Sequence, residues 1–267
     1  MSAMAPGLGH GLDISTTTPT PFRRLVAVEL RKSWDTRASF WLLGSIAALV
    51  VLAEGIGLAV VSVQNESVQF GDFVAVAAFM TSILLPVLGI MLVTTEWSQR
   101  TAMVTFALEP RRSLVIAAKA IVGILLTLVT VAFAIVIGLV CNLLYWGLEG
   151  HVDWTFGWSG FAAFLVTQTF AMLGGFALAA LLLNTPAAIV AFFVYKWVLP
   201  ILFALGSALM GWFESFSPWI NFQEAQNQLY DPPLTGEQWG QLVVSGVIWL
   251  VVPLVIGTWR ILRAEVK

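Results

Sequence analysis

The chain has 267 residues, of which 59% are apolar and only 10% are charged, and its formal net charge is −2. This composition leaves too little polar surface for a soluble globular protein of that length. The small net charge, with basic residues confined to a few short segments, excludes a nucleic-acid groove as a binding site. We therefore predict an all-α polytopic membrane protein with no nucleic-acid partner.

The amino-terminal residues fall into two segments of different composition. Residues 1–21 are rich in Gly, Pro, Ser and Thr and contain neither Lys nor Arg; they lack the features of a secretory signal, and we predict a disordered cytoplasmic tail. Residues 22–39 carry apolar side chains at helical three- and four-residue spacing, with basic residues between them. This pattern predicts an amphipathic helix along the inner membrane surface. The alternative is a helical flank whose charges only orient the first span.

Six apolar runs follow and make up the predicted transmembrane domain, residues 40–267. A helix needs about 20 apolar residues to cross roughly 30 Å of hydrocarbon. The runs that reach or nearly reach this length are 40–63, 73–94, 115–146, 161–183, 187–209 and 241–259. The third run is longer than one crossing requires, so we expect it to tilt or to emerge from the bilayer. Asn184, Thr185 and Pro186 predict a tight turn between the fourth and fifth runs.

The basic residues indicate the orientation of these spans. Of the thirteen Lys and Arg residues, Lys196 lies inside the fifth run and the others lie in three clusters beside runs. The clusters are Arg23, Arg24, Arg31, Lys32 and Arg37; Arg100, Arg111, Arg112 and Lys119; and Arg260, Arg263 and Lys267. Basic residues near span ends stay in the cytoplasm, where they also face anionic lipid. We predict a multi-pass protein of the cell membrane with both termini and residues 95–114 in the cytoplasm.

The segment between the second and third runs carries the most specific sequence pattern. It contains Glu96-Trp97, Thr101, Leu108, Pro110 and Arg111-Arg112, and it leads into Lys119. This pattern resembles the cytoplasmic loop of permease subunits in bacterial, and particularly actinobacterial, type-two ATP-binding-cassette (ABC) exporters. In that family an acidic residue closes the second span, a short helix rests on the ATPase subunit, and a Pro-Arg-Arg turn starts the third span. Members commonly have Gly just before the Thr, where this chain has Arg100.

The resemblance extends over residues 22–267 and implies a short cytoplasmic coupling helix between spans two and three. The residues that it assigns to the contact with an ATPase are Glu96, Trp97, Arg100, Thr101, Met103, Arg111 and Arg112. A loop that carries force between a soluble motor and the spans needs a stiff element, apolar contact groups and charges. The alternative is that the basic residues only orient the helices while the apolar residues bury in lipid headgroups.

The segment 211–240 contains four acidic residues, no basic residue, and a Pro232-Pro233 break between two potentially helical pieces. In the resembled family, this stretch forms short helices that dip into the outer leaflet and cap the pathway. Its first half is apolar enough to dip, whereas the polar residues that follow prevent a full crossing. The alternative is an ordered loop over the outer surface.

Glu54 and Lys196 are ionisable residues that lie deep inside the predicted spans. A charge near the bilayer centre costs on the order of 3 kcal/mol, so each is a candidate for the route of a polar part of the substrate. Their levels along the spans differ by about 7 Å, which disfavours a direct salt bridge. The alternatives are that Glu54 snorkels outward or is protonated in lipid, and that Lys196 packs against carbonyl groups or a polar partner.

Pro86, Pro200 and Pro253 lie inside predicted spans, where each removes one helical hydrogen bond and predicts a kink. The carbonyl groups that these prolines would free belong to Ser82, Lys196 and Trp249. The kinks are candidate bending points during transport, and static kinks are the alternative. Small residues at the spacing of close helix contacts are Gly55 with Ala59 and Ser207 with Gly211.

The sequence carries no phosphate-binding loop, metal-ligand cluster or nucleophile with a base. We therefore expect no catalytic residue, metal or cofactor in this chain, and ATP and Mg²⁺ in partner subunits. The resulting hypothesis is a permease subunit in the bacterial inner membrane. It forms a pathway with a second permease, either a copy or a relative, and two ABC ATPase subunits drive export. A lipid, glycan, peptide, drug or antibiotic would fit as cargo.

Three alternatives remain at this point. A non-transporting membrane anchor or sensor would share the architecture. An ion-coupled secondary transporter usually has buried acidic ion sites and an internal duplication, whereas this chain has Glu54 alone and no repeat. An intramembrane enzyme would need paired catalytic groups at one depth.

Overall fold

The computed structural model describes residues 20–64, 68–150 and 155–264, which are almost entirely helical and contain no strand. In chain order the elements are α1 Phe22–Asp35, α2 Arg37–Gln64, α3 Phe70–Ser98, α4 Ala102–Leu108, α5 Arg112–Glu149, α6 Gly157–Leu182, α7 Thr185–Phe193, the π-helix η1 Val194–Val198, α8 Leu199–Leu209, α9 Gly211–Ile220, α10 Phe222–Asn227, the 3₁₀-helix η2 Gln228–Tyr230, α11 Gly236–Gly246, the π-helix η3 Val247–Val251 and α12 Val252–Arg263. Residues 1–19 of the predicted tail lie outside this description.

Six helical stretches are long and apolar enough to cross a membrane. They are Arg37–Gln64, Phe70–Ser98, Arg112–Leu148, Gly157–Leu182, Thr185–Leu209 and Gly236–Arg263. The prediction of an all-helical chain with six such spans is therefore confirmed for the described residues. Most helices begin and end beyond the apolar runs, because polar residues continue the helical turn at each end. The segment 22–39 is divided, since Thr36 has an extended backbone and residues 37–39 already belong to α2.

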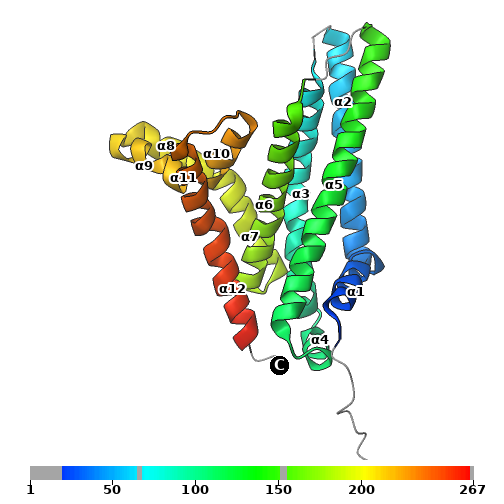
Figure 1. Cartoon of the computed structure of the whole chain (residues 1–267), viewed down its shortest axis with the longest axis vertical. Coiled ribbons are helices and arrows are strands. Elements are labelled where there is room, and N and C mark those ends of the chain that lie inside the picture. The colour runs from blue at the N-terminus through cyan, green and yellow to red at the C-terminus, as the bar shows by residue number, and fades with distance from the viewer. Residues whose placement is uncertain (1–19, 65–67, 151–154, 265–267) are drawn as a thin grey trace, which may run out of the picture.

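The start, middle and end of the described chain meet at one end of the bundle, which we call the basal end (Figure 1). Arg111 Nη2 donates a hydrogen bond to the carbonyl oxygen of Thr20 at 2.9 Å. Arg112 Nη1 donates to the carbonyl oxygen of Ala264 at 2.8 Å. An even number of crossings requires this arrangement, because both ends of the spanning region then lie on the same side.

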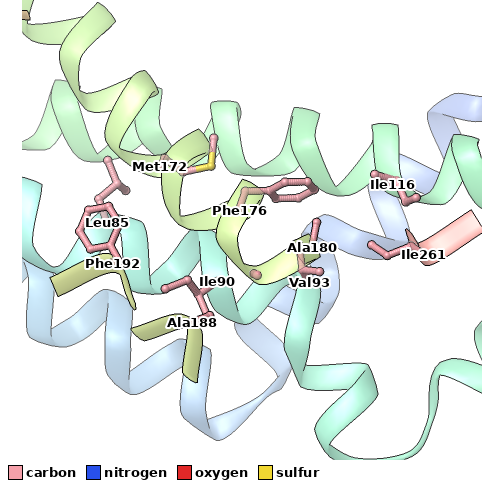
Figure 2. Close-up of a cluster of buried hydrophobic side chains, with 11 residues drawn as sticks. Leu85, Ile90, Val93, Ile116, Met172, Phe176, Ala180, Ala188, Phe192 and Ile261 are labelled. Atoms are coloured by element: carbon pink, nitrogen blue, oxygen red, sulfur yellow. The ribbon is translucent and has the colours of Figure 1, made fainter. Parts of the chain in front are cut away.

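Among the described helices, α3 and α6 share the most extensive packing. A Cβ added at Gly175 would overlap the carbonyl oxygen of Pro86, and one added at Gly89 would overlap the carbonyl oxygen of Met172. The absence of side chains at these two positions lets the backbones touch. Above and below this contact, buried side chains from five helices fill the centre of the bundle (Figure 2). They include Leu85, Ile90 and Val93 of α3, Ile116 of α5, Met172 and Phe176 of α6, Phe192 of α7 and Ile261 of α12.

The helices from α7 to α12 form an arm that leans away from the core helices α2, α3, α5 and α6 (Figure 1). The arm attaches mainly along α6. At Gly257 of α12, a Cβ would lie 2.7 Å from the backbone of Ala180 in α6, and the Arg260 guanidinium donates to the carbonyl oxygen of Leu181. The arm is therefore fixed to α6 near the basal end.

The predicted tight turn between the fourth and fifth runs is confirmed. Leu183 ends α6 in the left-handed region, with φ of 52°. Asn184 then caps α7, since its Oδ1 accepts the backbone N–H of Ala187 at 2.9 Å. Pro186 follows in the first turn, where its missing N–H leaves no intrahelical bond unmade.

Pro200 and Pro253 each follow a five-residue π-helix, a form the sequence analysis did not predict. In η1 the Leu199 N–H bonds the carbonyl of Val194, five residues back. Gln223 Nε2 of α10 donates to the carbonyl of Tyr195, five residues before Pro200, at 2.8 Å. The prediction that Pro200 frees the Lys196 carbonyl stays a prediction.

Two of the predicted close-contact positions form no contact with another element among the described residues. A Cβ at Gly55 or at Gly211 would meet no atom within 4 Å. In the segment 211–240, the helical pieces before Pro232-Pro233 are α9, α10 and η2, so the expected single piece is divided there, and α11 begins after the break at Gly236. Trp249 Nε1 links η3 to the end of α9 by donating to the Ile220 carbonyl at 2.7 Å.

The variant Gly175→Ala tests the α3–α6 contact. Its methyl group would force the two backbones apart, which costs about 1–3 kcal/mol of unfolding free energy. Gly55→Ala is the matched control, because it adds the same methyl group in open space. We expect the thermal unfolding midpoint of the purified chain in detergent to fall for Gly175→Ala alone. Equal midpoints for the two variants would contradict the packing described.

Candidate functional site

Residues 99–111 connect α3 to α5 at the basal end, and this connection begins where α3 ends in a Schellman motif. The Thr101 N–H bonds the Glu96 carbonyl at 2.8 Å, and the Arg100 N–H bonds the Trp97 carbonyl at 3.2 Å. Arg100 occupies the left-handed position of this motif, with φ of 57°. Glycine is the usual residue there because it lacks a Cβ. The backbone of this turn therefore has the conformation that favours glycine, although the residue at this position is Arg100.

The short helix α4 presents one apolar face to the surroundings. The exposed residues are Met103, Val104, Ala107 and Leu108, and Leu108 is 79% exposed to solvent. The opposite side packs inward, where Ala102 is buried and the ring of Phe106 lies 6.3 Å from that of Trp97. We call the exposed side the α4 face.

The two arginines after α4 have different roles. Arg111 forms two hydrogen bonds with the Glu109 carboxylate, at 2.7 and 3.0 Å, and these bonds hold the pKa of Glu109 below its usual value. Arg112 stacks over the ring of Phe106 at 4.9 Å and donates to carbonyl oxygens at the end of α12. Arg111 therefore borders the α4 face, while Arg112 links α4 to the arm.

Behind the α4 face, four charged side chains form a closed ring, which we call the basal charge cluster. It consists of Glu29 and Lys32 of α1, Glu96 of α3 and Lys119 of α5. Lys32 Nζ lies 2.7 Å from both Glu29 Oε1 and Glu96 Oε1. Lys119 Nζ lies 2.6 Å from Glu29 Oε2 and 3.2 Å from Glu96 Oε1. Each carboxylate thus contacts both ammonium groups, and the formal charges cancel.

Three members of the cluster are buried: Glu29, Glu96 and Lys119 are 5%, 8% and 6% exposed. Burial disfavours a charged ammonium, yet hydrogen bonds to Glu29 and Glu96 outweigh that effect and raise the pKa of Lys32 above its ordinary value of 10.5. Because the pKa is raised on folding, the contribution of Lys32 to stability is complete at neutral pH. That contribution is lost only as the pH rises through the raised pKa.

Glu29 was not identified from the sequence. It lies four residues after Leu25 and three after Val26 on the apolar side of α1. Because burying an unpaired carboxylate is costly, a carboxylate on that side either pairs with a buried cation or keeps that side of α1 in contact with water. This position was the one sequence signal of its role.

Glu54 lies in a sealed position among α2, α3 and α5. It is 0% exposed, and neither carboxylate oxygen has a hydrogen-bond partner. Its closest polar surroundings include the Ala77 backbone of α3 and the Cys141 thiol of α5. The described residues supply no cation to this carboxylate.

Lys196 lies elsewhere, in η1, on the wall of a cavity of about 1010 Å³ between the core and the arm. We call it the arm cavity. Its walls come from α3, α6, α7, η1, α8, α10, η2 and η3, together with Pro253 of α12. No ion pair joins Lys196 to Glu54 in the structure, and Glu54 does not line the cavity.

The structure therefore divides the residues singled out in the sequence into separate places. Arg100, Thr101, Met103 and Arg111 are exposed around the α4 face, Trp97 and Arg112 are half-buried beneath it, and Glu96 is buried in the basal charge cluster. Lys196, Pro200 and Pro253 line the arm cavity, whereas Pro86 lies in the α3–α6 contact. Within the described ranges, no three His, Cys, Asp or Glu side chains gather as metal ligands would.

Comparison with known proteins does not assign a family. No protein-family model matches the chain, and no curated protein matches its sequence.

Lys119→Met tests the basal charge cluster. It leaves two buried carboxylates with one half-exposed lysine, and breaking a buried pair in this way costs about 3–5 kcal/mol. Arg31→Met is the control, because Arg31 forms an ion pair with Asp35 at a side-chain exposure of 81%, and such pairs contribute about 0–1 kcal/mol. We expect chemical unfolding in detergent to show a large loss for Lys119→Met and partial recovery when Glu29→Gln is added. Similar losses for Lys119→Met and Arg31→Met would refute the cluster.

A second pair of variants tests the left-handed turn at Arg100. The left-handed conformation costs a residue with a Cβ roughly 1–2 kcal/mol, so Arg100→Gly should leave stability unchanged or raise it by up to about 1 kcal/mol. Arg100→Val should lower it, because a β-branched residue fits this conformation poorly. Thermal unfolding of both variants measures the difference. A Val variant as stable as the Gly variant would exclude a left-handed Arg100.

Proposed function

We propose that the chain is the permease subunit of an ATP-driven exporter, similar to type-two ABC exporters, whose motor is a separate ATPase that docks on the α4 face. One observation carries this proposal: an exposed apolar helix face is attached to a rigid base. The face is too small to be a span and too apolar to be a solvated loop. Its flanking arginines, Arg100 and Arg111, suit an acidic or polar rim on a partner.

The basal charge cluster supports the mechanical part of the proposal. It joins α1, the end of α3 and the start of α5 through ion pairs of 2.6 to 3.2 Å. A push on α4 is thereby passed to both neighbouring spans and to α1, because none of the three can move without opening buried ion pairs. Glu96 takes part in this coupling from inside the base rather than by touching the ATPase.

The arm supplies the part that moves. It is anchored at the basal end by Arg112 and by the Gly257 contact, and it diverges from the core beyond them (Figure 1). Each spanning stretch of the arm contains a π-helix followed by proline, at Pro200 and Pro253. Such turns have fewer of the bonds that stiffen an α-helix, and we place the bending there.

The remaining parts of the proposal concern the surroundings of the chain. The basal end faces the cytoplasm, because all basic residues of the described spans except Lys196 lie at or near it. The helix α1 rests along the inner surface, and α9 and α10 cap the outer end of the pathway. A second permease, a copy or a relative, covers the exposed apolar sides of α2 and α8, and ATP and Mg²⁺ bind only the ATPase pair.

Val104→Glu on the α4 face tests docking. A carboxylate in the centre of an apolar contact should weaken ATPase binding at least about tenfold, which corresponds to 1.4 kcal/mol. Ser113→Glu is the control, because Ser113 is exposed at the first turn of α5, where negative charge is favourable. The tagged chain is purified from its own host in mild detergent, and bound ATPase and its hydrolysis rate are measured. A bound ATPase that tolerates Val104→Glu would refute docking at α4.

One observation favours a second candidate function, an ion-coupled transporter. Both carboxylate oxygens of Glu54 are buried without a partner, and a coupling proton or cation would supply the missing charge. Vesicles that contain the chain alone separate the two candidates. Cargo movement driven by an ion gradient without an ATPase supports the second, whereas movement that requires the ATPase and ATP supports the first.

A further inference from the structure

We infer that the arm cavity is a binding site for an amphipathic anion, a molecule with an apolar body and one carboxylate or phosphate group, held by Lys196. The inference deepens the proposed permease function, on which it rests only for the idea that the bound molecule is cargo. The binding itself depends on this chain alone.

The size and walls of the cavity suit the apolar body. A volume of about 1010 Å³ lies at the upper end of the range for small-molecule sites, roughly 300–1,000 Å³. Most of its lining side chains are apolar or aromatic, among them Phe79, Phe170, Trp197 and Trp249. Aromatic and aliphatic walls of this kind hold an alkyl or aromatic body by excluding water from both surfaces.

The charge of the cavity suits an anion. Lys196 is half-buried on its wall, and none of the described residues that line the cavity is Asp or Glu. No described carboxylate forms an ion pair with Lys196, unlike Lys32 and Lys119. A half-buried ammonium in an apolar wall is stabilised when an opposite charge accompanies it, and the ligand is the group that can bring one.

Several donors of the cavity wall are already engaged within the chain, and the unpartnered Gln168 Oε1 is an acceptor, so Lys196 is the group that attracts the ligand charge. Gln168 Nε2 donates to the Ala78 carbonyl at 2.9 Å, and Gln223 Nε2 donates to the Tyr195 carbonyl. Tyr230 and Thr167 share a hydrogen bond of 2.9 Å between their hydroxyl groups. The cavity therefore does not resemble a site for a sugar or a peptide, which would need many free donors and acceptors.

The position of Lys196 gives the site a link to motion. The lysine belongs to η1 and lies four residues before Pro200, and the ring of the neighbouring Tyr195 contacts that of Trp249 in η3, with centroids 5.1 Å apart. The two π-helices thus form adjacent walls of the cavity. Bending at either one changes the distance between the ammonium group and α6, and with it the affinity for the anion.

A photoreactive long-chain fatty acid tests the site on the purified full chain in nanodiscs, with labelled peptides identified by mass spectrometry. We expect labelling of the stretches of α6 and η1 that line the cavity, with competition by oleate but not by oleyl alcohol. Competition by phosphatidylglycerol that equals oleate would also support an anion site and would assign it to membrane lipid. Equal competition by oleyl alcohol would overturn the role of charge.

Variants complete the test. Lys196→Met should reduce labelling of the cavity about tenfold, equivalent to 1.4 kcal/mol, whereas Lys196→Arg should retain it. Arg31→Met removes a positive charge far from the cavity and should have no effect. Ala171→Leu, on the α6 wall, should reduce labelling by filling the space while leaving the charge intact. Unchanged labelling in both Lys196→Met and Ala171→Leu would overturn the inference. The proposal that an ATPase docks on α4 would still stand, because it does not depend on the cavity.

Discussion

The basal charge cluster is the interaction on which the rest of the structure depends. Three helices that are far apart in the sequence, α1, α3 and α5, supply its four members, and each carboxylate contacts both lysines. A buried ion pair contributes little net stability compared with apolar packing, but it is costly to break one side of it. The cluster therefore acts less as a source of stability than as a fixed joint, and it sets the position of the loop that carries α4.

Two kinds of packing follow from this joint and divide the chain. On the core side, glycines bring α3 and α6 into backbone contact at Gly89 and Gly175, which leaves no freedom for sliding. On the arm side, the spans are interrupted by π-helices and prolines. The arm packs against α6 near its base, and it meets α6 again through α10 and η2, where the Phe222 ring lies 5.3 Å from that of Phe170 and the Tyr230 hydroxyl lies 2.9 Å from that of Thr167. A rigid core with a hinged arm leaves a cavity between them, and Lys196 lines it. In the proposed function, the ATPase docks on the α4 face of the rigid base, and the cargo binds in the arm cavity.

Hydropathy and charge were sufficient to predict the six spans and the turn at Asn184, because both depend on composition and on local chain chemistry. Resemblance to a known loop also indicated a short helix after Arg100. The rotation of each helix about its own axis was not predictable, since α3 and α6 are apolar on every side and have no amphipathic stripe. For that reason the burial of Glu96 and the contact at Gly175 were not predicted. Glu29 lies on α1, whose apolar side does show in the sequence, but its partners on α3 and α5 do not. The π-helices and the arm cavity depend on tertiary packing, which no local pattern records.

The most direct test of the joint is a distance measurement between spin labels on α1 and α4. Ala27 and Ala107 are exposed positions on these helices, and replacing the single cysteine, Cys141, leaves a background suited to labelling. The account predicts one narrow distance distribution in the unaltered base, unchanged when ATPase and nucleotide are added, and a broad distribution after Lys119→Met. A broad distribution with Lys119 in place, or a distance between α1 and α4 that changes with nucleotide, would contradict it.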